Sequence, residues 1–335
     1  MRNSIATLLI ILGSLFSFPA SAQTIKLGTV APDGSPWHLM LREMGEAWSK
    51  NSGGKIQLRI YTGGASGDEP DTVRKIRVGQ LHAGMLSNQG LTQIVPDVQA
   101  LHMPLLLTNN EELDYVKDRI TPKLDQLFES RGFKVLHWGE VGWVHFFTQK
   151  PVVRPEDLKP LRIWAWAGDD TSIVDAWKDA GYQAVPIPST EVLTALQTGL
   201  INAFVSPPIT ALAFQWFGLA KNMTDLKWLP LVGATIISAK MWQEIPENFR
   251  PMILQSARQA SLRYKPDVRK LNDDSVGIMK KHGLVVHKAS PEISAEWEPR
   301  ARAGYQRMIG RSVSAQMVAE VERLRNEYRN SQRSN

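Results

Sequence analysis

The sequence predicts an α/β protein of two lobes that face each other across a hinge. Strand-like segments with alternating hydrophobicity alternate along the chain with amphipathic helical segments, which is typical of open sheets covered by helices. The chain has 335 residues, more than one compact core usually holds. One helix–glycine–strand unit also occurs twice, with its glycine at Gly79 and again 120 residues later at Gly199. Chance similarity of two α/β units is the alternative to two related lobes.

The first half of the chain alternates strands and helices. "TIKLG" and "KIQLRIY" have the period-two pattern of strands, and Leu39–Trp48 between them has the period of an amphipathic helix. A second helix over Thr72–Val78 ends at Gly79, a residue suited to a C-cap, and leads into the buried strand "LHAGML". "FKVLHWG" and "VHFFTQ" are expected to be two further strands.

The second half continues the alternation and then becomes helical. "RIWAW" and "YQAVPI" are predicted strands on either side of a helix, and "EVLTALQTGLINAFV" is the second copy of the repeated unit. Beyond Pro246 the pattern is almost wholly helical, and Pro266 makes the first part either two helices or one kinked helix. Ser294–Arg329 is expected to form a terminal helix pair.

The N-terminus predicts export. Arg2 precedes the apolar run Ile5–Phe18, and Ala20-Ser21-Ala22 has the small-x-small pattern of a cleavage site. We therefore expect residues 1–22 to be a cleavable signal peptide and the mature protein to lie in the periplasm. An uncleaved membrane anchor is the alternative, although the run is shorter than the about 20 apolar residues of a spanning helix.

Composition argues against several other functions. The chain has no cysteine, which excludes thiol catalysis and cysteine-ligated zinc. The net charge of +6 comes with no basic stripe or groove-reading motif, so no nucleic-acid partner is expected. The seven histidines are spread singly, and no nucleophile elbow, Walker loop or His-Glu-x-x-His motif occurs. We expect no enzymatic activity, no metal and no cofactor.

Three strand ends mark the expected ligand position. Ligands of open parallel sheets bind beyond the carboxyl ends of the strands. Trp164 and Trp166 lie at one such end, Ser87-Asn88 at a second and Val205-Ser206 at a third. Since alternate residues of a strand share one face, the two tryptophans are expected to form part of a cavity wall.

Several motifs carry a resemblance to a known family. "DLKPLRIW" followed by "VPIPSTEVLTALQTG" resembles the most characteristic region of the DctP-type solute receptors of TRAP (tripartite ATP-independent periplasmic) transporters. "APDGSPWH", "MPLLL" and "ISAKMWQEIPENFRPMI" extend the resemblance over essentially the whole mature chain. It implies a type II-like periplasmic binding protein, with a hinge and a long connecting helix, that closes around a small solute. It also implies a monomer that hands this solute to membrane subunits.

The lobes are expected to be discontinuous in sequence. We assign residues 23–147 plus about 235–275 to lobe I, and residues 148–234 plus about 276–335 to lobe II.

The sequence departs from this family where the family binds a carboxylate. The family's ligand-pairing arginine falls on Trp164, a supporting asparagine on Ser206, and a second arginine on Val144. A carboxylate buried by lobe closure needs a cation or several donors to offset its desolvation. We therefore expect a neutral, aromatic or apolar solute rather than a simple dicarboxylate.

The predicted ligand-binding residues are rings and polar groups that the resemblance brings to the cleft. The rings are Trp37, Trp143, Trp164, Trp166, Phe204, Trp216 and Phe217, and the polar candidates are Glu69, Ser87, Asn88, Gln89, Asp169 and Ser206. Ordinary core packing is the alternative for each ring. Glu69 is also suited to starting a helix, and Asp169 to capping one. A ligand-presenting sensor partner of a membrane kinase remains the alternative function, because the same sequence would serve both roles.

Overall fold

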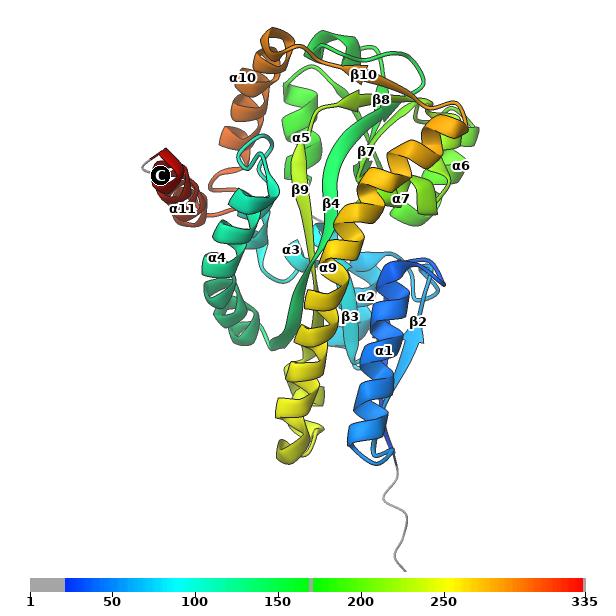
Figure 1. Cartoon of the computed structure of the whole chain (residues 1–335), viewed down its shortest axis with the longest axis vertical. Coiled ribbons are helices and arrows are strands. Elements are labelled where there is room, and N and C mark those ends of the chain that lie inside the picture. The colour runs from blue at the N-terminus through cyan, green and yellow to red at the C-terminus, as the bar shows by residue number, and fades with distance from the viewer. Residues whose placement is uncertain (1–21, 169–170, 334–335) are drawn as a thin grey trace, which may run out of the picture.

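The computed structural model describes residues 22–168 and 171–333 (Figure 1). The predicted signal peptide, apart from Ala22, and the candidate Asp169 lie outside the described residues.

Two groups of strands share one long strand. The spatial order is β2 (Ile56–Tyr61), β1 (Gln23–Gly28), β3 (Ala83–Ser87), β9 (Leu229–Ser238), β4 (Phe133–Thr148), β7 (Ala203–Ser206), β5 (Arg162–Trp166) and β6 (Gln183–Ile187). β8 (Asn222–Asp225) pairs with β4 and with β10 (Val285–Lys288). Residues 133–144 of β4 pair with β9, and residues 145–148 pair with β7. The strand β4 therefore runs from one group of strands into the other, as expected of a two-lobed α/β fold.

The strand β4 corrects the expectation of two separate strands. "FKVLHWG" and "VHFFTQ" belong to one continuous strand whose register shifts between Val135 and His137 and again between Glu140 and Gly142. Gly142 has a φ of +138°, and a Cβ there would meet the side chain of Asn272. The glycines in this segment thus accommodate an irregular, bulged strand rather than ending it.

Helices cover both lobes. They are α1 (Pro36–Asn51), α2 (Glu69–Arg77), α3 (Asn88–Thr92), α4 (Asn110–Ser130), α5 (Ser172–Asp179), α6 (Val192–Gln197), α7 (Pro208–Ala213), α8 (Ala239–Glu244), α9 (Arg250–Lys281), α10 (Pro291–Met308) and α11 (Ala315–Arg333). Short 3₁₀ helices occupy Pro96–His102, Pro155–Leu158, Ser189–Glu191, Trp216–Leu219 and Glu247–Phe249. None of the helices within 22–168 and 171–333 has the length and apolar character needed to cross a bilayer.

The repeated unit folds in the same way twice. α2 ends before Gly79 and leads to β3, and α6 ends before Gly199 and leads to β7. Both glycines have positive φ angles, +77° and +71°, which a residue with a Cβ adopts only with strain. The predicted succession of helix, glycine and strand is therefore confirmed in each lobe.

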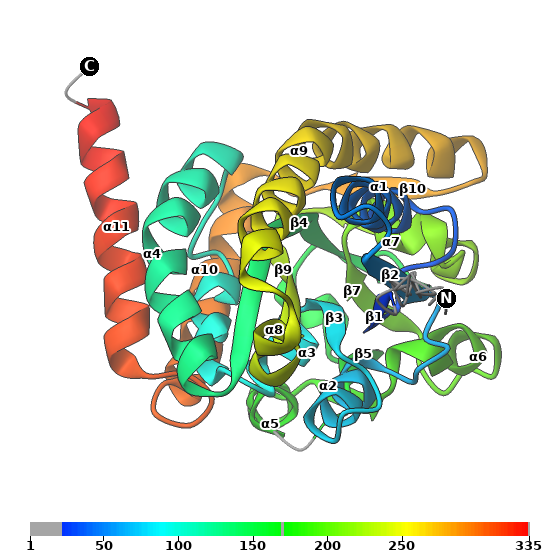
Figure 2. The ribbon, with the colours of Figure 1, turned by 90° about the horizontal axis from the view of Figure 1, so that it is seen from below.

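The long helix α9 connects the two lobes. It runs without interruption through Pro266 and packs against α1 and β4 before it reaches α7 (Figure 1). Of the two alternatives that Pro266 left open, the structure thus has a single helix. The expected terminal helix pair is α10 and α11, and α11 lies beside α4 at the edge of the molecule (Figure 2). The exact lobe boundaries stay a prediction.

Candidate ligand-binding site

A cavity of about 740 Å³ lies where the strand ends of the two lobes face each other. Its lining includes all three predicted positions, with Ser87 and Asn88 where β3 ends, Trp164 and Trp166 on β5, and Ser206 at the end of β7. The start of α1, the middle of α9, the central part of β4 and residues of α4, α5 and α10 also line it. Three further candidates, Trp37, Glu69 and Trp216, also line it.

Aromatic rings form the lobe II wall. Trp164 is only 4% exposed, and its ring centroid lies 5.0 Å from that of Trp166 and 5.4 Å from that of Trp216. Phe214, which the sequence did not suggest, stacks on Trp216 at 5.0 Å and also lines the cavity. The indole Nε1 of Trp164 donates to the carbonyl oxygen of Ile187 at 2.9 Å. Trp164 therefore offers ring surface rather than a free donor.

The structure does not bring three of the predicted rings to the cavity. The Nε1 of Trp143 donates to Oδ1 of Asn110 at 2.8 Å. Phe204 is fully buried and stacks on Phe147 with centroids 5.0 Å apart. Phe217 packs against the lobe II core. All three lie outside the cavity lining, in positions consistent with core packing.

Glu69 is held where β3 ends and α3 begins. Its carboxylate accepts hydrogen bonds from the backbone N of Ser87 at 2.9 Å, from Ser87 Oγ at 3.0 Å and from the backbone N of Gly90 at 2.7 Å. Burial raises the pKa of Glu69 to about 7, and these hydrogen bonds oppose the shift. Glu69 also begins α2 while lining the cavity, and its contact with a ligand stays a prediction.

Two contacts join the lobes beside the cavity. Oδ2 and Oδ1 of Asp68 in lobe I accept hydrogen bonds from the backbone N and the Oγ of Ser189 in lobe II, at 2.8 and 2.7 Å. Gln89 donates from Nε2 to the carbonyl oxygen of Ala167 at 2.7 Å. Gln89 does not line the cavity but bridges the lobes. The structure is therefore a state in which the lobes touch.

The three positions where the resemblance expects carboxylate partners hold no cation. Val144 and Trp164 line the cavity, and Ser206 Oγ donates to the carbonyl oxygen of Pro207 at 3.1 Å. Four cationic side chains line the cavity elsewhere, namely Lys117, Arg258, Lys265 and Arg300. Arg300 is paired with Glu156. The two lysines are also engaged with acidic partners.

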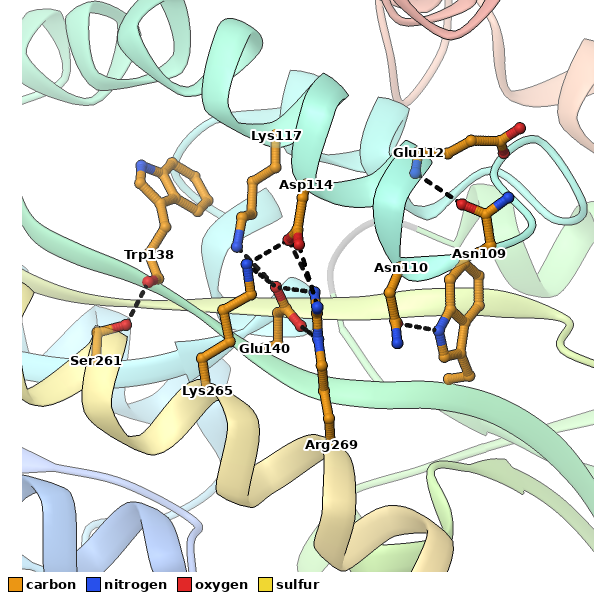
Figure 3. A network of polar contacts seen from close by, with 11 residues as sticks. Asn109, Asn110, Glu112, Asp114, Lys117, Trp138, Glu140, Ser261, Lys265 and Arg269 are labelled. Carbon is orange, nitrogen blue, oxygen red and sulfur yellow. Dashed lines mark hydrogen bonds and ion pairs between the residues drawn. The ribbon is translucent and has the colours of Figure 1, made fainter. Parts of the chain in front are cut away.

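Those two lysines belong to a charge network that joins α4, β4 and α9 (Figure 3). Lys117 Nζ lies 2.8 Å from Oε1 of Glu140, and Arg269 contacts both Glu140 and Asp114. Burial opposes ionisation of Asp114, but Arg269 and Lys265 hold the pKa of its carboxyl below the usual range. The network ties the connecting helix to β4 close to the point where that strand passes between the lobes.

Several polar atoms of the lining have no hydrogen-bond partner within the described residues. They are Nε1 of Trp37, Oδ1 of Asn88, both ring nitrogens of His137 and Oγ1 of Thr210. Sequence reasoning missed His137 and Thr210. A histidine inside an otherwise apolar strand was the signal for the first, and no pattern marked the second. The described residues contain no group of three or more acidic or histidine side chains that could hold a metal ion.

This fold and cavity define the class of hinged solute-binding proteins. The chain belongs to the bacterial extracellular solute-binding protein family 7, the DctP family, whose model matches residues 27–311. The relation to TRAP-type receptors that the sequence motifs suggested is thereby confirmed. The protein is a solute-binding receptor of a periplasmic family and not an enzyme.

Known relatives agree with this assignment. The 2,3-diketo-L-gulonate-binding periplasmic protein YiaO of Escherichia coli is 22% identical over 293 residues, which cover 85% of this chain and 88% of that protein. The sugar acid binding protein of Advenella mimigardefordensis in complex with galactonate superposes with a TM-score of 0.84 at 19% identity, covering 91% of this chain and 98% of that one. A TRAP periplasmic solute-binding protein of Haemophilus influenzae with bound L-gulonate gives 0.83 at 22% identity, covering 91% and 99%.

Proposed function

We propose that this protein is a monomeric periplasmic receptor that delivers a neutral, aromatic or apolar organic solute to the membrane subunits of a TRAP-type transporter. The observation that carries the proposal is the aromatic wall at Trp164. This wall stands at the position where the resemblance expects a carboxylate-binding arginine, and the indole N–H of Trp164 is already used by Ile187. Rings of this kind favour aromatic or apolar solutes over a carboxylate.

The acids named for the similar structures are ligands of those proteins, which share 19–22% of their residues with this chain. At that distance the fold is common while the ligand depends on individual side chains. Here Val144, Trp164 and Ser206 replace all three groups expected to hold a carboxylate. A dicarboxylate enclosed by these residues would lose its hydration without gaining an ion pair.

The size of the cavity also favours a larger solute. A volume of about 740 Å³ is within the range of pockets that enclose drug-sized ligands. Succinate would occupy a small part of it, and the rest would stay hydrated beside indole rings. A solute with an aromatic or aliphatic body would instead bury this surface.

Native mass spectrometry of the purified protein, followed by calorimetry, tests the proposal. We expect a co-purified neutral or aromatic solute, and no micromolar binding of succinate, galactonate, gulonate or galacturonate. Micromolar binding of any of these acids by the wild type would contradict the proposal. The same sample tests export, because N-terminal sequencing of periplasmic protein should begin at or near Gln23, and size exclusion should give a monomer.

A further inference from the structure

The cavity extends into lobe I beneath helices α1 and α9, where Trp37, Met85, His137 and Ser261 line it. We call this part of the cavity the compartment. His137 on β4 pairs directly with Thr235 on β9, and Thr235 pairs with Met85 on β3. Directly paired residues point to the same face of a sheet, so these three side chains form one row. Two residues beyond Thr235 on the same face, Ile237 packs in the core beneath α1 and α9. The row lies one layer closer to the cleft.

The two helices supply the opposite wall. On α1, Trp37 lies one turn before Leu41, which packs in that same core, and Met40 lies beside it. On α9, Ser261 lies one turn after the core residue Ala257, and its Oγ donates to the carbonyl oxygen of Trp138 at 2.8 Å (Figure 3). The helix therefore contacts β4 at the residue next to His137. Trp37, Met40, Met85, His137 and Ser261 all line the cavity.

The compartment gathers buried polar atoms that lack protein partners. His137 is 6% exposed and Thr235 is fully buried. Both nitrogens of His137, Oγ1 of Thr235 and Nε1 of Trp37 make no hydrogen bond of ordinary geometry with the described residues. Groups buried in this way are destabilising unless something else pairs with them.

The chemistry of these atoms limits what they can bind. Burial lowers the pKa of His137 to about 4, an effect that the backbone of Trp138 partly offsets, so the ring is neutral at pH 7. A neutral imidazole offers one donor and one acceptor, a hydroxyl offers both, and an indole offers a donor. Met40 and Met85 give the remaining wall an apolar character. Such a site matches a group that is neutral and both donates and accepts.

We propose that the compartment lined by Trp37 and His137 is a second subsite that receives the neutral polar end of the solute, a carboxamide or a hydroxyl. The inference rests on the proposed function, since the rings around Trp164 hold the other end. His137 lies in the part of β4 that pairs with β9, and Trp164 lies on β5, which follows β7 on the other side of β4. The solute that joins the two subsites is therefore elongated.

Calorimetry with ω-phenylalkanamides, from benzamide to 8-phenyloctanamide, tests the subsite. We expect affinity to rise steeply once the chain reaches the compartment, and the matched phenylalkanoates to show no such rise. Trp37→Phe removes one polar atom of the lining at nearly constant shape and should weaken the long amides about 5- to 10-fold. Benzamide binding should not change in this variant. Thr198→Val, which removes an exposed hydroxyl that bonds only to backbone carbonyls of α6 and lies outside the cavity lining, is the control and should have no effect on either ligand.

A second measurement addresses the compartment alone. In protein labelled with ¹⁵N-histidine, acetamide should produce a saturable shift of the His137 signals, which His137→Gln identifies by their loss, whereas acetate should not. If neither a chain-length effect nor this shift appears, the compartment holds water only and the proposal is wrong. If benzamide fails to bind while the acetamide shift is present, the proposed binding of aromatic solutes at Trp164 is wrong and the subsite at His137 is supported.

Discussion

The contact between Asp68 and Ser189 should control the balance between open and closed receptor. It joins lobe I to lobe II through two hydrogen bonds to one carboxylate, and both residues are at least nine-tenths buried. Ser189→Ala removes the Oγ bond of 2.7 Å and leaves the backbone bond and the helix cap of Asp68 in place. The variant therefore weakens closure without disturbing either lobe.

The size of the effect follows from the charge of the acceptor. A hydrogen bond to an ionised group contributes about 1.5–3 kcal/mol, and we take the lower value because the backbone bond remains. A loss of about 1.5 kcal/mol lowers the closed-to-open ratio about tenfold. Because the solute binds the closed state, the apparent affinity should fall by up to the same factor.

The absence of cysteine allows the closed-to-open ratio to be measured with site-specific labels. Val78 in lobe I and Leu200 in lobe II are 66% and 53% exposed, so Val78→Cys and Leu200→Cys can carry a unique pair of spin labels. Double electron–electron resonance should show the longer inter-label distances gaining population in Ser189→Ala. Ser130→Ala, an exposed serine that bonds only within α4, is the control. Unchanged distances together with an unchanged affinity would refute the role of this contact.

Three further predictions concern the wall, the charge network and pH. Trp164→Ala should weaken binding of the native solute by about 1.5–3 kcal/mol in calorimetry, because it removes ring surface from the cavity wall. Trp143→Phe, outside the cavity, is the control and should not change the affinity. Equal affinities of the two variants would contradict the aromatic wall. Glu140→Gln leaves Lys117 buried without its carboxylate and should cost about 3–5 kcal/mol in urea unfolding; a loss below 1 kcal/mol would argue against a structural network. The folded-state pKa of Glu69 lies above the unfolded value of 4.5, so its contribution to stability is complete below pH 4.5 and is lost as the pH rises to about 7. Glu69→Gln should remove this decline in denaturation curves taken between pH 4.5 and 7.5, and an unaltered decline would assign it to another group.

Local patterns were sufficient for most of the fold. The repeated unit could be predicted because a glycine with positive φ must follow each of its helices, and Gly79 and Gly199 stand at equivalent points. The continuity of β4 could not be predicted, because glycines normally mark strand ends. Its pairing with β9 and β7 holds the irregular segment in one strand. Likewise, Pro266 left two alternatives that contacts with α1 and β4 decide in favour of one helix.

The site was predictable at the strand ends and less so elsewhere. Positions such as Trp164 and Ser206 could be inferred because the carboxyl ends of strands in each lobe meet at the cleft. The sequence could not predict which rings line the cavity and which lie in the core. Phe204 and Trp216 are in contact with each other, and only Trp216 lines the cavity. His137 was missed because its exposure to the cavity arises from three strands and two helices that are distant in sequence.

Charge and hydrogen bonding at Trp164 favour a ring over a cation at this position. An arginine at this position would need a carboxylate partner whenever the lobes close, or its own desolvation would oppose closure. The indole N–H instead donates to the carbonyl oxygen of Ile187 within lobe II, so Trp164 has no unsatisfied donor before a solute binds. Closure of the empty cleft then costs no unpaired charge at Trp164. The bonds of Asp68 with Ser189 and of Gln89 with Ala167 join the lobes through protein groups alone. A receptor of this design should therefore sample its closed state without solute to a measurable extent, and the spin-label experiment on unliganded wild type should detect that population directly.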